Sequence, residues 1–386
     1  MYDQKQVQEI AALPSPVLTV YLNTANQDPS LHPVVPACLR WFTDEGEALS
    51  RTLLPRDRKR FNEQAERFER FLSLRRPQEK AMVAFVGPDV WEVLPLHICL
   101  ENQLGWGKPF VAQLFKLLSE HKPYGIVVVD HQRARFFQFH LGELTALGEK
   151  QYEIDESQWK RTDVGHIPSD RTRKAQGPDR NLFEHRLRAQ FEHLCAETAH
   201  QLLALSKKND FAGLFLVGAH RLIDPIQKHF PHLASGLVVS VSEDMGGFAH
   251  AEIRRRLEPL VADYERKRQV ADVDQFMADD SRTVTGADET LARLQAGTIR
   301  TLVVAANHDF PVHECARCGV VSRSSDVACA DCGGERRRIA LLDVLPRLSA
   351  AHGVKVEFIE GEAAQVLAKA GGIGGWLRQS KRTAVG

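Results

Sequence analysis

Residues 124–130 read Tyr-Gly-Ile-Val-Val-Val-Asp. An apolar run without alternating polar positions is typical of a strand that is buried on both faces of a sheet. Residues 135–139 predict its hairpin partner, with Gly142 at the next turn, and residues 211–218 and 236–241 predict two further buried strands. The order strand, strand, loop, helix, strand, helix, strand predicts a mixed sheet with flanking helices.

The loop in this pattern is polar and basic. Residues 168–181 read Pro-Ser-Asp-Arg-Thr-Arg-Lys-Ala-Gln-Gly-Pro-Asp-Arg-Asn, and the two prolines and the glycine argue against a regular helix or strand across the segment. Between Lys160 and Arg188, eight Lys or Arg residues stand against four Asp or Glu residues. Because these cations pair with phosphate oxygens, the loop predicts a contact with phosphate-rich RNA. A solvated surface loop is the alternative.

A long helix is expected after the loop. Asn181, with Glu184 three residues later, predicts the N-cap, and the helix is expected to run to about Lys207. Cys195 is interpreted as a packing residue beside the buried stripe of this helix. The stripe recurs at three- and four-residue steps and consists of Leu187, Phe191, Leu194, Thr198, Leu202 and Leu205.

Composition restricts the class of protein. The 386 residues suffice for two to four domains, and 50 basic residues balance 50 acidic ones. With no overall positive charge, any nucleic-acid contact must come from a local patch. No apolar run reaches the roughly 18 residues that span a bilayer, and the first residues lack the pattern of a signal peptide. Seven cysteines, four of them in two tight pairs, indicate a reducing compartment, so we expect a cytoplasmic protein.

The first third of the chain predicts a small α+β domain without a catalytic constellation. Its expected strands are residues 17–22, 81–86 and 91–96, and its expected helices are residues 36–53, 55–75 and 108–121.

The last third contains the most specific motif, two cysteine pairs separated by ten residues. The pairs are Cys315 with Cys318 and Cys329 with Cys332, and each is followed by a glycine that lets the turn bend. Four thiolates on two tight turns can close a tetrahedron around Zn²⁺, whereas four unrelated surface thiols are the alternative. Such a site has no open coordination position, so the predicted Zn²⁺ is structural.

Regular elements are expected on both sides of this motif. They are helices at residues 254–269, 339–348 and 361–370, a further helix within residues 283–294, and strands at residues 301–305 and 354–359.

Residues 371–378, Gly-Gly-Ile-Gly-Gly-Trp-Leu-Arg, close the predicted fold. They do not join a strand to a following helix and lack the Lys-Ser/Thr ending of a phosphate loop. They resemble the closing signature of the C-terminal domain of archaeal and eukaryotic class I release factors. Residues 124–130, the basic loop and the long helix are similar to the central domain of the same proteins. The chain thus resembles the release factor and Pelota superfamily, in particular its bacterial branch, which includes Balon-like ribosome hibernation factors.

The resemblance implies an α/β (α+β) protein of three domains. Residues 1–122 would form the small N-terminal domain. Residues 123–253 would form an RNase H-like central domain that carries the basic loop 160–180. Residues 254–386 would form an L7Ae-like domain with an inserted zinc ribbon at residues 313–335.

The resemblance also implies partners. A protein of this kind enters the ribosomal A site with a translational GTPase, which in bacteria would be elongation factor Tu. We expect a monomer off the ribosome and no membrane partner. The RNA-binding residues would be Arg171, Arg173, Lys174, Gln176 and Arg180, close to the peptidyl transferase centre.

Two departures from the superfamily affect the expected mechanism. Release factors use a Gly-Gly-Gln tip, but none of the Gly-Gly pairs, at residues 246–247, 333–334, 371–372 and 374–375, precedes Gln. The Asn-Ile-Lys-Ser motif that is placed on a stop codon is also missing. The first hypothesis is therefore a non-catalytic factor that occupies the A site of idle or stalled ribosomes, as in hibernation.

Two alternatives remain open. In the first, Gln176 supports peptidyl-tRNA hydrolysis on stalled ribosomes. In the second, the chain is a zinc-ribbon nucleic-acid binder or a nuclease outside translation. A two-metal nuclease is disfavoured because Asp130, Glu143, Asp224 and Glu243 form no spaced pair.

Overall fold

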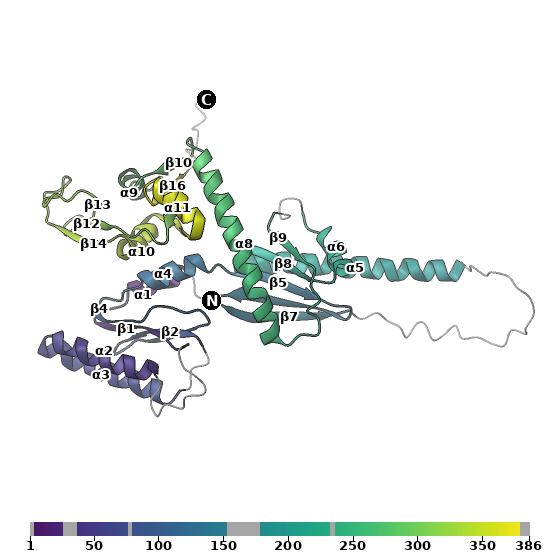
Figure 1. Cartoon of the computed structure of the whole chain (residues 1–386), viewed down its shortest axis with the longest axis horizontal. Helices are drawn as coiled ribbons and strands as arrows, with labels where there is room; N and C mark the ends of the chain where they lie inside the picture. The colour runs from purple at the N-terminus through teal and green to yellow at the C-terminus, as the bar shows by residue number, and fades with distance from the viewer. Residues whose placement is uncertain (1–3, 26–36, 76–78, 153–177, 232–235, 379–386) are drawn as a thin grey trace, which may run out of the picture. The chain divides into compact units, whose positions relative to one another are not determined.

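The computed structural model describes residues 4–25, 37–75, 79–152, 178–231 and 236–378 (Figure 1). These residues form a mixed α/β fold with four sheets. The chain divides into two compact units, one made of Met1–His121 with Glu258–Gly386 and the other of Lys122–Leu257. Within the described ranges, no helix has the length and apolar character needed to cross a membrane.

The N-terminal sheet is antiparallel, with strand order β3-β2-β1-β4. Its strands are β1 (Val17–Asn23), β2 (Ala81–Val86), β3 (Trp91–Leu96) and β4 (Gln103–Gly107). Two helices, α2 (Ala37–Thr52) and α3 (Pro55–Ser73), pack on one of its faces through a core that includes Phe42, Phe61 and Phe68 (Figure 1). The strands and helices predicted for this region are confirmed, while β4 and the short helix α1 (Gln4–Ala11) were not predicted.

The central sheet has the order β7-β6-β5-β8-β9. Its elements are β5 (Tyr124–Val129), β6 (Arg133–His140), β7 (Glu143–Gln151), α5 (Pro178–Asn209), β8 (Gly213–Gly218), α6 (His220–Gln227) and β9 (Val238–Val241). β5 pairs antiparallel with β6 and parallel with β8, so the predicted mixed sheet is correct. β7 was not predicted, since it is a largely exposed edge strand without a continuous apolar run.

The start of α5 differs from the prediction. The helix begins at Pro178 rather than after Asn181, so the expected N-cap is wrong, as is the expectation of no helix through residue 181. A proline suits the first turn of a helix because the N–H it lacks has no partner inside the helix there. The side chains of residues 178–188 lie outside the described structure, and farther along α5 the expected packing of Cys195 is confirmed, at 2% exposure.

The C-terminal sheet has the order β10-β16-β11-β15 and follows the long helix α8 (His250–Ala278). Its elements are β10 (Thr283–Thr285), α9 (Ala287–Gln295), β11 (Ile299–Ala305), α10 (Leu341–His352), β15 (Lys355–Ile359), α11 (Gly361–Lys369) and β16 (Ile373–Leu377). The helix expected within residues 283–294 is confirmed as α9, and residues 283–285 before it pair with β16 as an edge strand. By contrast, Ile339 belongs to a strand, and the helix expected from that residue begins at Leu341.

The glycines of residues 371–378 allow β16 to occupy the inside of this sheet. A Cβ on Gly374 would lie 2.6 Å from Cζ of Phe276 in α8 and 2.7 Å from the carbonyl oxygen of Val284 in β10. A Cβ on Gly375 would lie 2.7 Å from Cδ1 of Ile299. The segment follows helix α11 and forms a strand, which agrees with the expectation that it is no phosphate loop.

We predict that Gly374→Ala destabilises the unit that contains the C-terminal sheet. The added methyl group meets a backbone oxygen that cannot rotate away, and overpacking of this kind costs about 1–3 kcal/mol. Thermal unfolding followed by tryptophan fluorescence measures the effect. Gly236→Ala is the matched control, because a Cβ at Gly236 meets nothing within 4 Å. Equal melting temperatures for both variants would contradict the prediction.

Helix α4 (Ala112–Glu120) carries a buried carboxyl group beside β15. The Ser119 hydroxyl donates a hydrogen bond of 2.5 Å to the carbonyl of Val356, which seats the end of α4 on β15. Burial, followed by the charge of Glu360, raises the pKa of Glu120 to about 7, although Lys116 opposes the shift from 3.6 Å. The folded state therefore holds the proton of Glu120 more tightly than the unfolded state does.

The stability of this unit should fall as pH rises from about 4.5 to 7. The stabilisation from protonated Glu120 is complete below the unfolded-state pKa and is lost as pH passes through the raised folded-state value, a change of roughly 3 kcal/mol. Denaturant titrations at several pH values should give a flatter profile for Glu120→Gln than for the wild type. Glu101→Gln, at an exposed position, should keep the wild-type slope. Parallel profiles for wild type and Glu120→Gln would refute the assignment.

Candidate functional site

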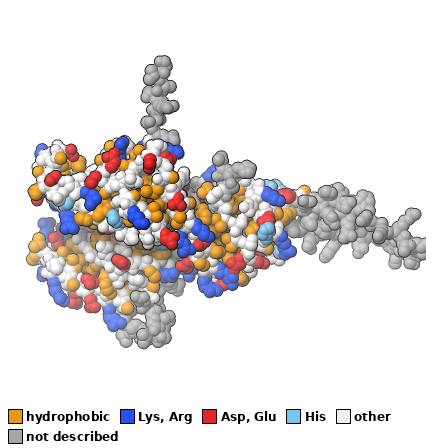
Figure 2. Space-filling model, turned by 45° about the horizontal axis from the view of Figure 1, so that its top comes forward, with side chains coloured by type: hydrophobic (Ala, Val, Ile, Leu, Met, Phe, Trp, Pro, Cys, Tyr) orange, Lys and Arg blue, Asp and Glu red, His pale blue; other side chains and the backbone are white. Residues whose placement is uncertain are grey.

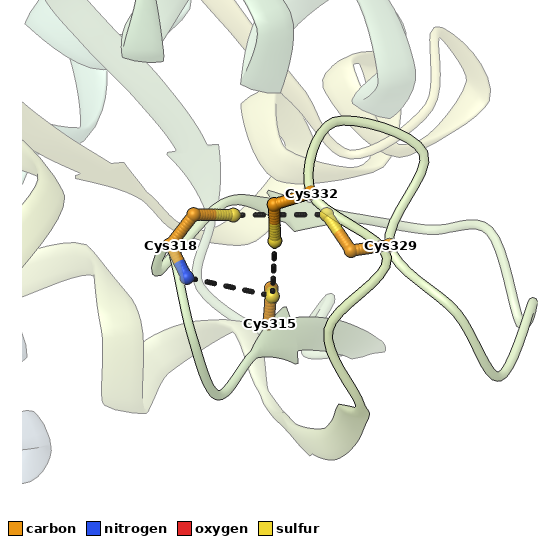
Figure 3. Close-up of side chains that lie close together, drawn as sticks. All are labelled: Cys315, Cys318, Cys329 and Cys332. Carbon is orange, nitrogen blue, oxygen red and sulfur yellow. Dashed lines mark hydrogen bonds between the residues drawn. The ribbon is translucent and has the colours of Figure 1, made fainter.

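The four paired cysteines converge at one point (Figure 3). Cys315 ends strand β12 (Pro311–Cys315), and its Sγ lies 3.5 Å from Sγ of Cys332. Sγ of Cys318 lies 3.6 Å from Sγ of Cys329, and all four sulfurs lie within 4.8 Å of one another. The expected cluster is therefore present, and it is the one group of three or more potential metal ligands among the described residues.

Backbone geometry prepares the sulfur of Cys315 to act as a thiolate. The N–H groups of Arg317 and Cys318 donate to Sγ of Cys315 at 3.4 and 3.5 Å. The hydrogen bond from Cys318 is the main cause that lowers the pKa of Cys315 to about 6. Gly319 and Gly333 close the two turns at φ values of 73° and 69°, which side chains other than glycine rarely adopt.

The donor set fits Zn²⁺. Zn–S bonds of about 2.3 Å in a tetrahedron separate neighbouring sulfurs by about 3.8 Å, close to the distances within the cluster. Four thiolates leave no coordination position open for water or substrate, so a bound ion would be structural. His313, on the same strand, is not part of the ligand group.

The cysteine turns are joined to the C-terminal sheet by side-chain contacts. The small sheet around them has the order β13-β12-β14, with β13 (Val321–Ser322) and β14 (Arg336–Ala340). The amide of Gln295, in α9, accepts from the N–H of Val321 at 2.7 Å and donates to its carbonyl at 2.8 Å. Arg347, in α10, binds Glu314 at 2.6 Å. An ordered ribbon therefore also fixes the end of α9 and the middle of α10.

We predict one Zn²⁺ per chain and its loss on Cys318→Ser. A thiolate is replaced by a weak ligand, and the remaining three sulfurs no longer close the tetrahedron. Elemental analysis of purified protein measures the zinc, and a chelator should lower the melting temperature of the wild type. Cys99→Ser, which removes an exposed thiol outside the cluster, should keep the full zinc content. Zinc-free wild-type protein with an unchanged melting temperature would contradict the site.

The predicted RNA-binding residues fall on the basic loop. Arg171, Arg173, Lys174 and Gln176 lie outside the described residues, and Arg180 lies in the first turn of α5 without a described side chain. Their role in RNA binding stays a prediction.

The structure does describe where the loop leaves the sheet. Tyr152 follows β7, and its hydroxyl lies 3.3 Å from Oγ1 of Thr198 in the middle of α5. Lys150, in β7, forms an ion pair with Glu197, next to Thr198. Burial raises the pKa of Tyr152 to about 12, so its hydroxyl stays protonated and can donate to Thr198. These partners are 46 and 47 residues apart in sequence, and no local sequence signal indicated them.

Helix α5 extends well beyond this attachment (Figure 1). Pro178 precedes Thr198 by twenty residues, which is about 30 Å along a helix at 1.5 Å per residue. The part of α5 that packs on the sheet lies in the C-terminal half of the helix, where Cys195, Ala199 and Leu202 are buried in the central core. The chain therefore leaves the sheet beside Thr198 and re-enters the fold about 30 Å away, at the N-terminus of a helical stalk.

The acidic residues of the central unit have local structural partners. Asp130 accepts hydrogen bonds from the N–H groups of Gln132 and Arg133 at 2.7 and 2.9 Å, which caps the β5–β6 turn. Asp224 pairs with His220, and Glu243 pairs with Arg256. No carboxylate cluster for metal ions occurs in the described part of this unit.

Charged side chains on the surface are mixed in sign. On the face seen in Figure 2, Lys and Arg alternate with Asp and Glu, and no large patch of one sign stands out among the coloured residues. The surplus of cations in the sequence is at residues 160–188.

Comparison with known proteins gives one family match. Residues 109–259 match family 10 of the bacterial archaeo-eukaryotic release factors. No curated protein matches the chain.

Several solved structures are similar to the chain at low identity. An archaeal translation termination factor, aRF1, is 14% identical over 98% of each chain, with a TM-score of 0.24. Dom34 of S. cerevisiae, described as a translation termination-like factor, is 9% identical over 97% of this chain and 93% of its own, with a TM-score of 0.38. An archaeal Pelota, from a model of ribosome-bound Pelota and ABCE1, is 12% identical over 97% of this chain and 94% of its own, with a TM-score of 0.40.

Proposed function

Because residues 109–259 match family 10 of the bacterial archaeo-eukaryotic release factors, we propose that the chain is a ribosome-binding translation factor of this family. It occupies the A site of idle or stalled ribosomes and protects them, as in hibernation. The observation that carries this proposal is that the matched segment contains both the basic loop and the stalk α5.

The stalk supports the proposal on geometric grounds. Residues 171–176 directly precede α5 in sequence, and the N-terminus of α5 lies about 30 Å along the helix from Thr198. A helix N-terminus also carries a partial positive charge and free N–H groups, which favour phosphate. A cationic group on such an arm suits a narrow channel in structured RNA.

The sequence supports binding rather than catalysis. The Gly-Gly-Gln tip of release factors is missing, and the loop offers only Ala175-Gln176-Gly177. Arg171, Arg173, Lys174 and Arg180 contact ribosomal RNA near the peptidyl transferase centre, with Gln176 close by. Binding needs charge and shape only, so it survives without the tip.

The remaining parts of the chain fit the same role. The C-terminal part, with its structural Zn²⁺ ribbon, docks on a translational GTPase, for which elongation factor Tu is the candidate. The protein acts in the cytoplasm as a monomer off the ribosome. The order of the central sheet, with three antiparallel strands followed by two parallel ones, suits an RNase H-like domain.

Hydrolysis of peptidyl-tRNA by Gln176 is the second candidate function, because Gln176 is the one glutamine of the basic loop between residues 160 and 180. In a reconstituted release assay, Gln176→Ala would abolish activity under this alternative. A nuclease outside translation is disfavoured, since Asp130 and Glu243 have local partners.

We predict salt-sensitive co-sedimentation with ribosomes that depends on the loop. The triple variant Arg171→Gln, Arg173→Gln, Lys174→Gln should bind roughly tenfold or more weakly and with a shallower salt dependence, because each lost phosphate contact removes a counterion-release contribution. The measurement is pelleting of the zinc-loaded protein with vacant ribosomes across a range of salt concentrations.

A matched triple variant controls for charge. Lys207→Gln, Lys208→Gln, Lys228→Gln removes three exposed cations from the same unit, at the ends of α5 and α6, and should bind like the wild type. No pelleting of the wild type at any salt concentration would reject the function. Equal weakening by both triple variants would reject the role of the loop.

A further inference from the structure

A pocket with charged walls lies in the C-terminal part of the chain, and the four cysteines are not among its lining residues. It has a volume of about 360 Å³ and lies between the last turns of α8 and the end of the C-terminal sheet. Its floor includes Val303, Ile359 and the half-buried ring of Trp376. The rings of Trp376 and Phe276 pack edge to face, with their centroids 5.4 Å apart.

One arginine of the pocket is held ready for a ligand. The register of β11 against β16 jumps from Ile299 to Thr301, so Arg300 is the extra residue of a β-bulge. Bulges re-aim a side chain, and here Arg300 lines the pocket while remaining exposed. Its guanidinium forms no ion pair with any residue that the structure describes.

The bulge itself is braced by the closing segment of the fold. Arg378 donates to the carbonyl of Ile299 at 3.0 Å and to that of His352 at 2.6 Å. The backbone immediately before Arg300 is therefore held by a side-chain hydrogen bond.

The other charged side chains of the pocket already have partners. Arg282 pairs with Asp279 at 2.8 Å but is 61% exposed, and it lines the pocket together with Arg300. Arg268 is paired with Glu265 and Asp272. Glu357, which pairs with Lys355 at 3.8 Å, lines the pocket from β15. In the sheet, β15 lies three strand spacings, or about 14 Å, from β10, the strand that follows Arg282.

A ligand for this pocket needs an anionic end, hydrogen-bond donors at the opposite end and a flat body. A nucleotide has these properties. Its phosphate pairs with arginine, its base lies against an aromatic ring, and the exocyclic amine of adenine, guanine or cytosine donates to a carboxylate. The volume is at the lower end of the range of ligand pockets and too large for a lone phosphate.

We infer that this pocket binds one nucleotide unit, with the phosphate at Arg300 and Arg282, the base beside Trp376 and the base edge at Glu357. The nucleotide is either free or an unpaired nucleotide of RNA, and the second source rests on the proposed ribosome binding.

The test is calorimetry on the full zinc-loaded chain with four nucleoside monophosphates and with a short single-stranded RNA of mixed sequence. Arg300→Gln should weaken binding about tenfold, because a charge-assisted hydrogen bond is lost. Glu357→Gln should weaken binding of AMP, GMP and CMP more than that of UMP, which has no exocyclic amine. Arg293→Gln, an exposed arginine on α9 outside the pocket, should bind like the wild type.

The two sources give different results. If the RNA binds more tightly than every monophosphate, the natural ligand is a nucleotide of RNA. If a monophosphate binds more tightly than the RNA, the natural ligand is a free nucleotide. Absence of saturable binding by any probe, or equal binding by Arg300→Gln and wild type, would overturn the inference. If the protein pellets with ribosomes but binds no probe, this inference fails and the proposed function stands. If it binds a nucleotide but does not pellet with ribosomes, the proposed function fails and this inference stands.

Discussion

The packing of α5 on the central sheet is the interaction on which the projecting part of this protein depends. The C-terminal half of the helix packs into the central core through Cys195, Ala199 and Leu202. A long helix in water is stabilised mainly by packing of this kind, so the first turns, which extend past the sheet, rely on the seated half. The ion pair of Lys150 with Glu197 fixes the sheet end of the same connection.

This arrangement separates charge from structure. The chain as a whole is neutral, and charged residues of the two signs pair with each other on the exposed faces of α8 and α9. Residues 160–188 carry eight basic residues against four acidic ones, whereas the rest of the chain carries 42 basic residues against 46 acidic ones. A local basic segment in a chain without overall positive charge directs electrostatic attraction to that segment, which agrees with a partner of concentrated negative charge.

The C-terminal part is closed by two devices that replace side-chain packing. In the ribbon, four sulfurs converge where a bound metal ion can hold the two cysteine turns together. A hydrogen bond between Val321 and Gln295 connects the ribbon to α9. In β16, the absence of side chains lets Phe276 and β10 come within contact of the backbone. Both devices suit small sheets that bury little apolar surface.

Much of the fold follows from patterns within single segments. The apolar runs at residues 124–130 and 211–218 indicate buried strands, and the spacing of Cys315, Cys318, Cys329 and Cys332 indicates a tetrahedral site because each pair is a local turn. Patterns failed where the local signal was weak. β7 is an exposed edge strand of mixed polarity, and β10 is three residues long and exists only through its pairing with β16.

The sequence by itself determined the buried strands, the cysteine ligands and the glycines of residues 371–378, since each depends on neighbours in the chain. The tertiary structure alone decided which distant side chains meet. Tyr152 reaches Thr198, and Arg300 shares a pocket with Glu357, because strand order and helix packing bring together groups that lie tens of residues apart. No periodicity in the sequence indicates contacts between residues so far apart in the chain. The attachment of α5 beside Tyr152 and the pocket lined by Arg300 are therefore seen only in the folded chain.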